Sequence, residues 1–285
     1  MSETAAESVV PFPPYVENWE MPEMPREGDL PEDDNVPMES SWHRDAMNFL
    51  IELIRSHMEG RTDFYTGGNM FIHFSATQVR NNDFRGPDVF FVGGVDGSKE
   101  RKFWAVWLEE NRYPDVIIEL LSPCTARQDR TTKKAIYEKT FQTPNYFIYD
   151  PNERRLEGWQ LINGQYEPLV ANKRGWLWSD KLEAWLGIWA GLFHRTIPDV
   201  WLRLFDAEGR IVPSFDEKAQ QQARRARRQA KAALQRERRR TDEALQLASA
   251  AAERMVAERQ RAESAEKELT QLRALLAAKG NPPTA

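Results

Sequence analysis

The sequence predicts an α/β protein with a mixed β-sheet flanked by helices, followed by one long helix of coiled-coil type. Apolar, β-branched and aromatic runs over residues 88–92, 115–121 and 145–149 are typical of buried strands. Stretches compatible with helices precede and interrupt these runs. From residue 216 to residue 279 there is no proline, glycine or aromatic residue. Helix, strands, helix and strands in this order indicate a sheet covered by helices.

The first predicted element is a helix over residues 42–58. Ser40 or Ser41 supplies the N-cap hydroxyl, and Gly60 stands at the C-terminal exit. Apolar residues recur at spacings of three and four, so they form one stripe that faces a core. The stripe consists of Met47, Leu50, Ile51, Ile54 and Met58.

Strands follow in two groups, separated by a helix predicted over residues 130–141. The first group is expected over residues 70–74, 88–92, 104–108 and 115–121. The second group is expected over residues 145–149, 156–161, 166–170, 201–205 and 210–212. The dipeptide Asn163-Gly164 is the strongest hairpin signal in the chain, because a tight two-residue turn favours these residue types.

Composition divides the 285 residues into three parts. Residues 1–38 form a tail with seven prolines, and residues 1–40 hold eleven acids against the single base Arg26. Such a segment buries too little apolar surface to fold alone, so we expect it to be irregular. Residues 39–213 contain nearly all aromatic residues and form the predicted domain, whereas residues 214–285 form the long helix with a short tail.

Alanine and leucine recur along the long helix at alternating spacings of three and four, which is the pattern of a coiled coil. The positions are Ala219, Ala223, Ala226, Ala230 and Ala233, and further on Ala262, Ala265, Leu269, Leu272 and Leu276. The pattern is interrupted at Glu237 and Arg240, and its first half is weak. This seam either joins copies of the chain into a homodimer or higher homo-oligomer, or folds back on the domain.

Charge is distributed unevenly. The net charge is −5, yet residues 218–240 hold ten Lys or Arg against the single acid Glu237. The overall balance therefore argues neither for nor against nucleic acid as a partner. Within this segment we define the arginine block, which is a solvated helix face, a surface that binds DNA phosphates, or a group of charges that neutralises the acidic N-terminal tail of the same or a partner chain. The arginine block consists of Arg224, Arg225, Arg227 and Arg228.

Several other classes are not expected. No run approaches the length of a membrane span, and no leader opens the chain, so we expect neither a membrane protein nor secretion. The single cysteine, Cys124, cannot form an internal disulfide, which fits a reducing, cytoplasmic location. His57, His73 and His194 have no metal-ligand spacing.

Two acids and an amine carry the predicted chemistry. Asp88 opens one apolar strand and Glu119 lies inside another, while Lys133 shares a helical face with Tyr137. Each has a structural alternative, namely a turn aspartate, a buried ion pair and an exposed helix lysine. Taken together, they match metal-assisted phosphodiester hydrolysis, in which carboxylates hold a cation and a fixed amine offsets the charge on phosphorus.

Four segments resemble the Uma-type restriction endonuclease family, a branch of the PD-(D/E)XK nuclease superfamily. The resemblance covers about residues 41–205. The segments are Arg85-Gly86-Pro87-Asp88-Val89; residues 114–123; Asp129-Arg130 with Lys133 and Tyr137; and residues 146–151. The resemblance implies a restriction-endonuclease-like fold, and the long helix is a common appendage in that family.

The resemblance also implies roles for individual residues. Asp88, Glu119 and the carbonyl of Leu120 would bind Mg²⁺ or Mn²⁺. The superfamily lysine normally occupies the place of Leu121, but relatives of this kind carry it on the next helix, where Lys133 lies. The supporting residues would be His43, Asp129 and Tyr137.

The function expected from these residues is hydrolysis of DNA phosphodiester bonds by a metal-activated water. Asp88, Glu119 and Lys133 would be the catalytic residues. An alternative from another class is a catalytically weak module that binds DNA or builds an oligomer on a nuclease fold. A third possibility is a phosphodiester in RNA or in a nucleotide.

Overall fold

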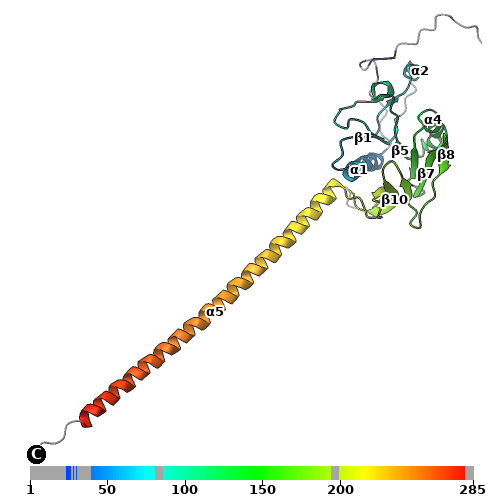
Figure 1. The fold of residues 1–285 in the computed structure, drawn as a ribbon. Coiled ribbons are helices and arrows are strands. Elements are labelled where there is room, and N and C mark those ends of the chain that lie inside the picture. Colours follow the sequence, from blue (N-terminus) through cyan, green and yellow to red (C-terminus); the bar gives the residue numbers. More distant parts are fainter. Residues whose placement is uncertain are drawn as a thin grey trace, which may run out of the picture. The chain divides into compact units, whose positions relative to one another are not determined.

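The computed structural model describes residues 24–26, 28, 30, 40–80, 86–193 and 199–279, and Figure 1 shows the order of its elements. The chain divides after Asp216 into two units, each described below by itself. Most of the predicted acidic tail lies outside the described residues. None of the described helices is long and apolar enough to cross a membrane.

The main sheet of the first unit has six strands in the order β1-β3-β5-β6-β7-β8. These strands are β1 (Phe64–Gly67), β3 (Val89–Gly93), β5 (Val116–Leu120), β6 (Asn145–Asp150), β7 (Arg155–Ile162) and β8 (Gln165–Pro168). β5 and β6 pair in parallel, and the other neighbours pair antiparallel. The predicted mixed α/β fold with a long C-terminal helix is therefore confirmed.

Both faces of the central strands are buried. Val89, Phe91 and Ile118 pack into one hydrophobic cluster, whereas the alternate residues Phe90 and Ile117 pack into another. Successive side chains of a strand point to opposite faces, so these strands are continuously apolar in sequence. An ionisable residue inside such a strand, as Glu119 is in β5, therefore lies within a core.

Two smaller sheets complete the unit. One is antiparallel, in the order β11-β10-β9, with strands β9 (Leu177–Ser179), β10 (Ala184–Gly191) and β11 (Asp199–Phe205). The other pairs β2 (Ile72–His73) with β4 (Trp104–Ala105) in parallel. Helix α1 (Ser41–His57) packs its apolar stripe between the main sheet and the β11-β10-β9 sheet, in the cluster that also holds Trp201 and Leu204.

Most predicted elements are present, with corrections at the edges. The hydroxyl of Ser40 caps α1 by accepting a hydrogen bond from the amide of His43. The predicted strand 104–108 is wrong beyond Ala105, where the backbone turns into the short helix η2 (Val106–Leu108). The predicted strand 210–212 reduces to one bridge, between Phe205 and Ile211. Strands β1, β9 and β10 and helix α2 (Ala76–Arg80) were not predicted.

The helix predicted over residues 130–141 begins earlier and is not uniform. It consists of α3 (Ala126–Gln128), one π-helical turn η3 (Asp129–Lys133) and α4 (Lys134–Lys139). Single π-turns within helices occur frequently at functional sites. This segment covers the sheet face that carries Phe90 and Ile117.

The long helix is α5 (Phe215–Lys279), which has 65 residues. Every described side chain from residue 219 to residue 276 is exposed. The predicted long helix is therefore confirmed, and its pairing as a coiled coil stays a prediction.

Candidate active site

Asp88 and Glu119 lie next to each other on neighbouring strands. β3 and β5 are antiparallel, with Val89 opposite Ile118, so the same register places Asp88 opposite Glu119. Opposite residues of an antiparallel pair project from the same face of the sheet. The amide of Asp88 donates to Oε2 of Glu119 over 3.3 Å, which keeps the two residues together.

The carboxylate of Asp88 is held by groups from two other elements. Its Oδ1 lies 2.8 Å from Nε2 of His43, which is buried in the first turn of α1. Its Oδ2 accepts a hydrogen bond of 2.6 Å from the amide of Leu120 in β5. These contacts fix both oxygens of a side chain that stands at the start of its strand, before the ladder begins.

Glu119 is completely buried, and its carboxylate contacts the helical segment above the sheet. The hydroxyl of Tyr137 donates to Oε1 over 2.9 Å, and Nζ of Lys133 lies 3.2 Å from the same oxygen. A buried carboxylate needs such partners, because desolvation without them is costly.

Lys133 also contacts a second acid from its own helix. Its Nζ lies 2.8 Å from Oδ1 of Asp129, one helical turn earlier, and the side chain of Asp129 is almost fully buried. Asp129, Lys133 and Tyr137 follow one another at intervals of four residues and so project from one face of the segment. Lys133 and Tyr137 therefore both reach Glu119, while Asp129 reaches Lys133.

Burial changes the ionisation of this cluster. Burial raises the pKa of Glu119 to about 8. Lys133 opposes that rise, whereas Asp88 and Asp129 reinforce it. For Lys133 the balance is opposite, because burial acts to lower its pKa but the neighbouring carboxylates outweigh burial and raise it. Burial and then Glu119 raise the pKa of Tyr137 well above its usual range, so its phenol remains a hydrogen-bond donor.

The residues fit a small, hard cation. In the described part of the chain, no three His, Cys, Asp or Glu side chains gather into a metal cluster. Mg²⁺ does not require one, since it commonly binds through one or two carboxylates together with water and substrate phosphate. Asp88 and Glu119 provide that pair. An ionised carboxylate offers about four lone-pair sites, more than the contacts above occupy.

The carbonyl of Leu120 points to the same place. The amide of Leu120 is directed at Asp88, and the N–H and C=O of one strand residue face the same side. The register that sets Val89 opposite Ile118 places Pro87 opposite Leu120, and proline has no N–H to donate. Beyond the end of the ladder this carbonyl is thus available as a third oxygen ligand beside Asp88.

A cavity of about 380 Å³ opens beside the cluster. His43 and Leu121 line it from the side of the carboxylates, while Trp42, Asn152 and Asp199 line the remainder. The indole of Trp42 stacks on Trp201, with ring centroids 5.9 Å apart. The described residues that line it include the acid Asp199 but no Lys or Arg.

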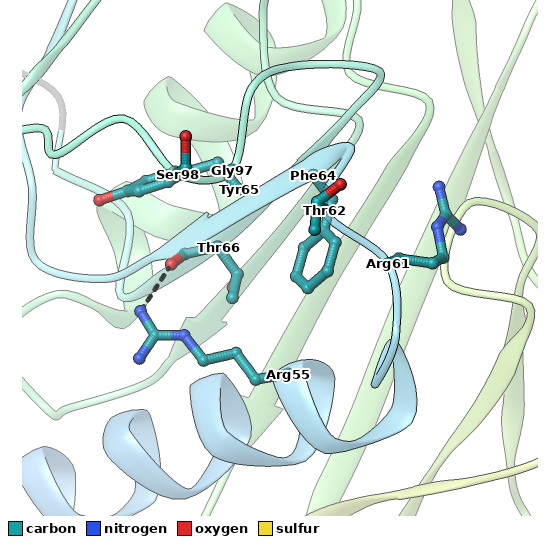
Figure 2. Close-up of a pocket in the computed structure, with 8 residues that line it drawn as sticks. All are labelled: Arg55, Arg61, Thr62, Phe64, Tyr65, Thr66, Gly97 and Ser98. Atoms are coloured by element: carbon teal, nitrogen blue, oxygen red, sulfur yellow. Dashed lines mark hydrogen bonds between the residues drawn. The ribbon is translucent and has the colours of Figure 1, made fainter.

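A second cavity, of about 330 Å³, lies elsewhere in the unit (Figure 2). Arg55 of α1, Tyr65 and Thr66 of β1, and Ser98 of the turn after β3 line it, and Arg55 donates weakly to the carbonyl of Thr66 over 3.4 Å. None of the predicted site residues is among the described residues that line this second cavity, so Asp88 and Glu119 do not open into it.

Comparison with known protein families agrees with the family expected from the sequence. The sequence model of the Uma2 family, described as "Putative restriction endonuclease", matches residues 24–191, which is more than half of the chain. The chain belongs to the Uma2 family. Family membership confirms the predicted family and supports a nuclease.

A solved structure similar to this Uma2 protein is from Anabaena variabilis, described as "a putative nuclease belonging to DUF820". The two sequences are 16% identical, the similarity covers 51% of this chain and 76% of that chain, and the TM-score is 0.36. None of the curated proteins compared with the chain matches it.

In this Uma2 family member the predicted site residues of the domain come together in one cluster. They are His43, Asp88, Glu119, Leu120, Asp129, Lys133 and Tyr137. The arginine block lies on α5 in the other unit, where all four side chains are exposed. The catalytic, metal-binding and DNA-binding roles of these residues stay predictions.

Sequence reasoning missed Gly68. A Cβ at this position would collide with the carbonyl oxygen of Asp88 and press on Met47 and Ile51 of α1. The absence of a side chain at Gly68 lets the chain after β1 pass between α1 and Asp88. The signal was the pair Gly67-Gly68, which directly follows the strand-favouring residues Phe64, Tyr65 and Thr66.

Proposed function

We propose that this protein is a divalent-metal-dependent DNA endonuclease. Its catalytic residues for phosphodiester hydrolysis would be Asp88, Glu119 and Lys133. The observation that carries the proposal is the convergence of two carboxylates from adjacent strands, with an amine 3.2 Å from the second. This set supplies hard oxygen ligands and a fixed positive charge in a single place.

Mg²⁺ or Mn²⁺ would be held by Asp88, Glu119 and the carbonyl of Leu120. When bound, the cation would lower the pKa of a water ligand and polarise the phosphoryl group. The remaining parts of the mechanism belong to side chains of the chain itself.

Lys133 has two tasks in this proposal. It holds Glu119 and Asp129 in place, at 3.2 and 2.8 Å, and its ammonium offsets negative charge that develops on the phosphate. Tyr137 orients Glu119 through its hydroxyl, and His43 orients Asp88 through Nε2. Residues of this kind act by positioning the metal-binding oxygens rather than by touching the substrate.

The proposed substrate is duplex DNA, and the proposed partners follow from both units. The cavity beside His43 would take a nucleoside next to the scissile phosphate, because Trp42 offers an aromatic ring and no cation lines the described walls. The arginine block would bind backbone phosphates. Copies of the chain would join through α5 as a homodimer or higher homo-oligomer.

A second candidate function is a catalytically weak module that binds DNA or serves as an oligomeric scaffold. It is favoured by the fact that each carboxylate oxygen of Asp88 and Glu119 already has a protein partner within 3.3 Å. If those contacts persist at all times, a cation would have to share oxygens that the protein already holds.

The test is incubation of supercoiled plasmid with the full chain in Mg²⁺, Mn²⁺ or EDTA, alongside Lys133→Ala and the exposed control Lys139→Ala. Metal-dependent cleavage that is lost in Lys133→Ala but kept in Lys139→Ala supports the endonuclease. Retarded plasmid without cleavage in any metal supports the binding module instead. A parallel reaction with labelled RNA reports whether the phosphodiester must belong to DNA.

A further inference from the structure

The π-turn η3 arranges the side chains that gather around Glu119. In a regular α-helix, side chains four residues apart drift around the axis by about 40° per step, because one turn takes about 3.6 residues. Two steps, from Asp129 to Lys133 and on to Tyr137, would add up to about 80°. A π-turn closes its hydrogen bonds to the fifth residue and so winds less per residue. Because η3 spans Asp129–Lys133, it offsets this drift and brings the three side chains into line.

The contacts of Lys133 depend on that alignment. Its Nζ lies 2.8 Å from Oδ1 of Asp129 and 3.2 Å from Oε1 of Glu119. The hydroxyl of Tyr137 lies 2.9 Å from the same Oε1. Both carboxylates are almost fully buried, so an ammonium that pointed elsewhere would leave buried acids without a counter-charge, which is costly. The winding of one helical turn therefore decides whether Lys133 reaches Glu119.

Tyr146 of β6 holds this turn from outside the helix. π-Turns are rare, so contacts beyond the helix itself are expected to stabilise one. The hydroxyl of Tyr146 donates a hydrogen bond of 2.9 Å to the backbone carbonyl of Asp129, the first residue of the turn. Both residues are buried. This bond fixes the start of the turn relative to the sheet.

The ring of Tyr146 is itself held in place by other aromatic rings. Its centroid lies 5.2 Å from that of Tyr137, in an edge-on arrangement. It stacks with Trp159 at 5.7 Å and with Tyr166 at 5.9 Å. Burial raises the pKa of Tyr146 well above its usual range, so the hydroxyl keeps its proton and remains a donor. Tyr146 thus presents a hydrogen-bond donor at a fixed position below the turn.

Arg130 supplies a second contact to the turn, from a partly exposed position. Its guanidinium lies 2.9 Å from Glu157 of β7 and 3.4 Å from Asp150 at the end of β6. The side chain of Arg130 is 30% exposed, so water screens these ion pairs. The hydrogen bond from Tyr146 lies in the interior, where water does not compete with it. The buried bond is therefore the stronger constraint on the geometry of the turn.

We propose that Tyr146 is a positioning residue of the proposed active site. Its hydroxyl holds the π-turn at Asp129, and the turn places the ammonium of Lys133 against Glu119. Removal of the hydroxyl takes a buried hydrogen bond from the turn, so the turn loses its geometry and Lys133 withdraws from Glu119. The consequence for catalysis rests on the proposed function, whereas the placement of Lys133 does not.

The first experiment compares Tyr146→Phe with the matched control Tyr166→Phe in the full chain. Each change removes one phenol hydroxyl that donates to a backbone carbonyl, over 2.9 Å to Asp129 and over 3.0 Å to Thr143. Each variant is made alone and together with Lys133→Met. Urea denaturation in EDTA, followed by tryptophan fluorescence, gives the unfolding equilibrium constant of every variant.

The effects of Tyr146→Phe and Lys133→Met should overlap, because both remove the same placement of the ammonium. The combined effect on the unfolding constant should fall short of the product of the single effects by at least about threefold. The effects of Tyr166→Phe and Lys133→Met should multiply within about twofold, as independent sites do. Multiplication for both tyrosines would overturn the inference, because Tyr146 would then stabilise the core without placing Lys133.

The second experiment measures plasmid nicking in Mg²⁺ by the same single tyrosine variants. Tyr146→Phe should lower kcat by about 10–100-fold with the KM for DNA nearly unchanged, because it displaces Lys133 rather than a DNA contact. Tyr166→Phe should keep the parent rate. If the parent cuts and Tyr146→Phe cuts equally fast, Tyr146 is not a positioning residue of the reaction. A parent chain that does not cut contradicts the proposed nuclease instead, and the unfolding constants still decide the placement of Lys133.

Discussion

Replacement of Lys133 by methionine tests the electrostatics of the site most directly. Methionine keeps most of the side-chain length and removes the charge. The side chain of Lys133 is 14% exposed and that of Glu119 is fully buried, so solvent screens their interaction poorly. Two unit charges 3.2 Å apart attract by about 5 kcal/mol at an effective dielectric constant of about 20. Desolvation offsets part of this, and loss of one partner of a buried pair costs about 3–5 kcal/mol of unfolding free energy.

The expected cost depends on pH. Glu119 ionises near 4.5 when unfolded, but burial raises its pKa to about 8 in the fold. Between those values the folded protein holds a proton that the unfolded chain has lost, so stability falls as pH rises through this window. Lys133 lowers the pKa of Glu119. Without Lys133, that pKa is higher, so the loss of stability with rising pH continues to higher pH. Lys133→Met should therefore cost more at about pH 9 than at about pH 6.

Urea denaturation in EDTA, followed by tryptophan fluorescence, measures the effect as a double-mutant cycle of Lys133→Met with Glu119→Gln. The coupling free energy should be about 1–3 kcal/mol at about pH 9 and close to zero at about pH 6. Contact with Asp129 contributes to the single variant but not to this coupling. Lys139→Met, on the exposed side of α4, should change stability little. Equal coupling at both pH values would refute a buried, proton-binding Glu119.

Three further outcomes are expected. Asp88→Asn should lower the rate of plasmid nicking by at least about 10³-fold, since it removes several kcal/mol of charge stabilisation, while circular dichroism stays unchanged. Gly68→Ala should lower both the melting temperature and the nicking rate, because its Cβ would displace Asp88, whereas Gly86→Ala, whose Cβ meets atoms no nearer than 3.6 Å, should not. Replacement of the arginine block by glutamines should reduce the slope of log binding constant against log salt by up to about 4, measured by anisotropy of labelled duplex DNA. An unchanged slope would assign those arginines to a solvated face.

The sheet could be predicted where burial makes strands apolar on both faces. Residues 115–121 and 145–149 are predominantly apolar and aromatic, and both ranges form central strands, β5 and β6. The long helix was equally clear, because its composition excludes breakers. Hydrophobic pattern and composition are local properties of the sequence, so they can be read without knowing the tertiary contacts.

Strand β10 could not be predicted because its glycines make sense only in three dimensions. Gly187 and Gly191 weaken the strand pattern of residues 184–191. In the fold, a Cβ at Gly187 would occupy the space of the Trp176 ring, which also stacks on Phe205 at a centroid distance of 3.7 Å. The Trp176 ring fills the space that a side chain at Gly187 would take. No pattern in the sequence around Gly187 predicts this contact.

Within the site, the spacing of residues in the sequence predicts part of the geometry, and the packing of α1 against the sheet determines the rest. The interval from Lys133 to Tyr137 predicts a shared helical face, and both side chains contact Glu119. The meeting of His43 with Asp88 joins residues 45 positions apart. That contact depends on how α1 packs against the sheet, so only the family resemblance suggested it.

The contacts that stabilise the cluster involve the same carboxylate oxygens that would bind the proposed cation. A proton on Glu119 and the ammonium of Lys133 neutralise the acids that face one another across β3 and β5. A divalent cation between those acids would supply the same neutralisation and would release the proton, because only the ionised carboxylate is a ligand. Lys133 would then be free to turn its charge toward substrate phosphate. In the proposed mechanism the same residue thus links the stability of the fold to the charge offered to the phosphate, and the two should change together when Lys133 is replaced.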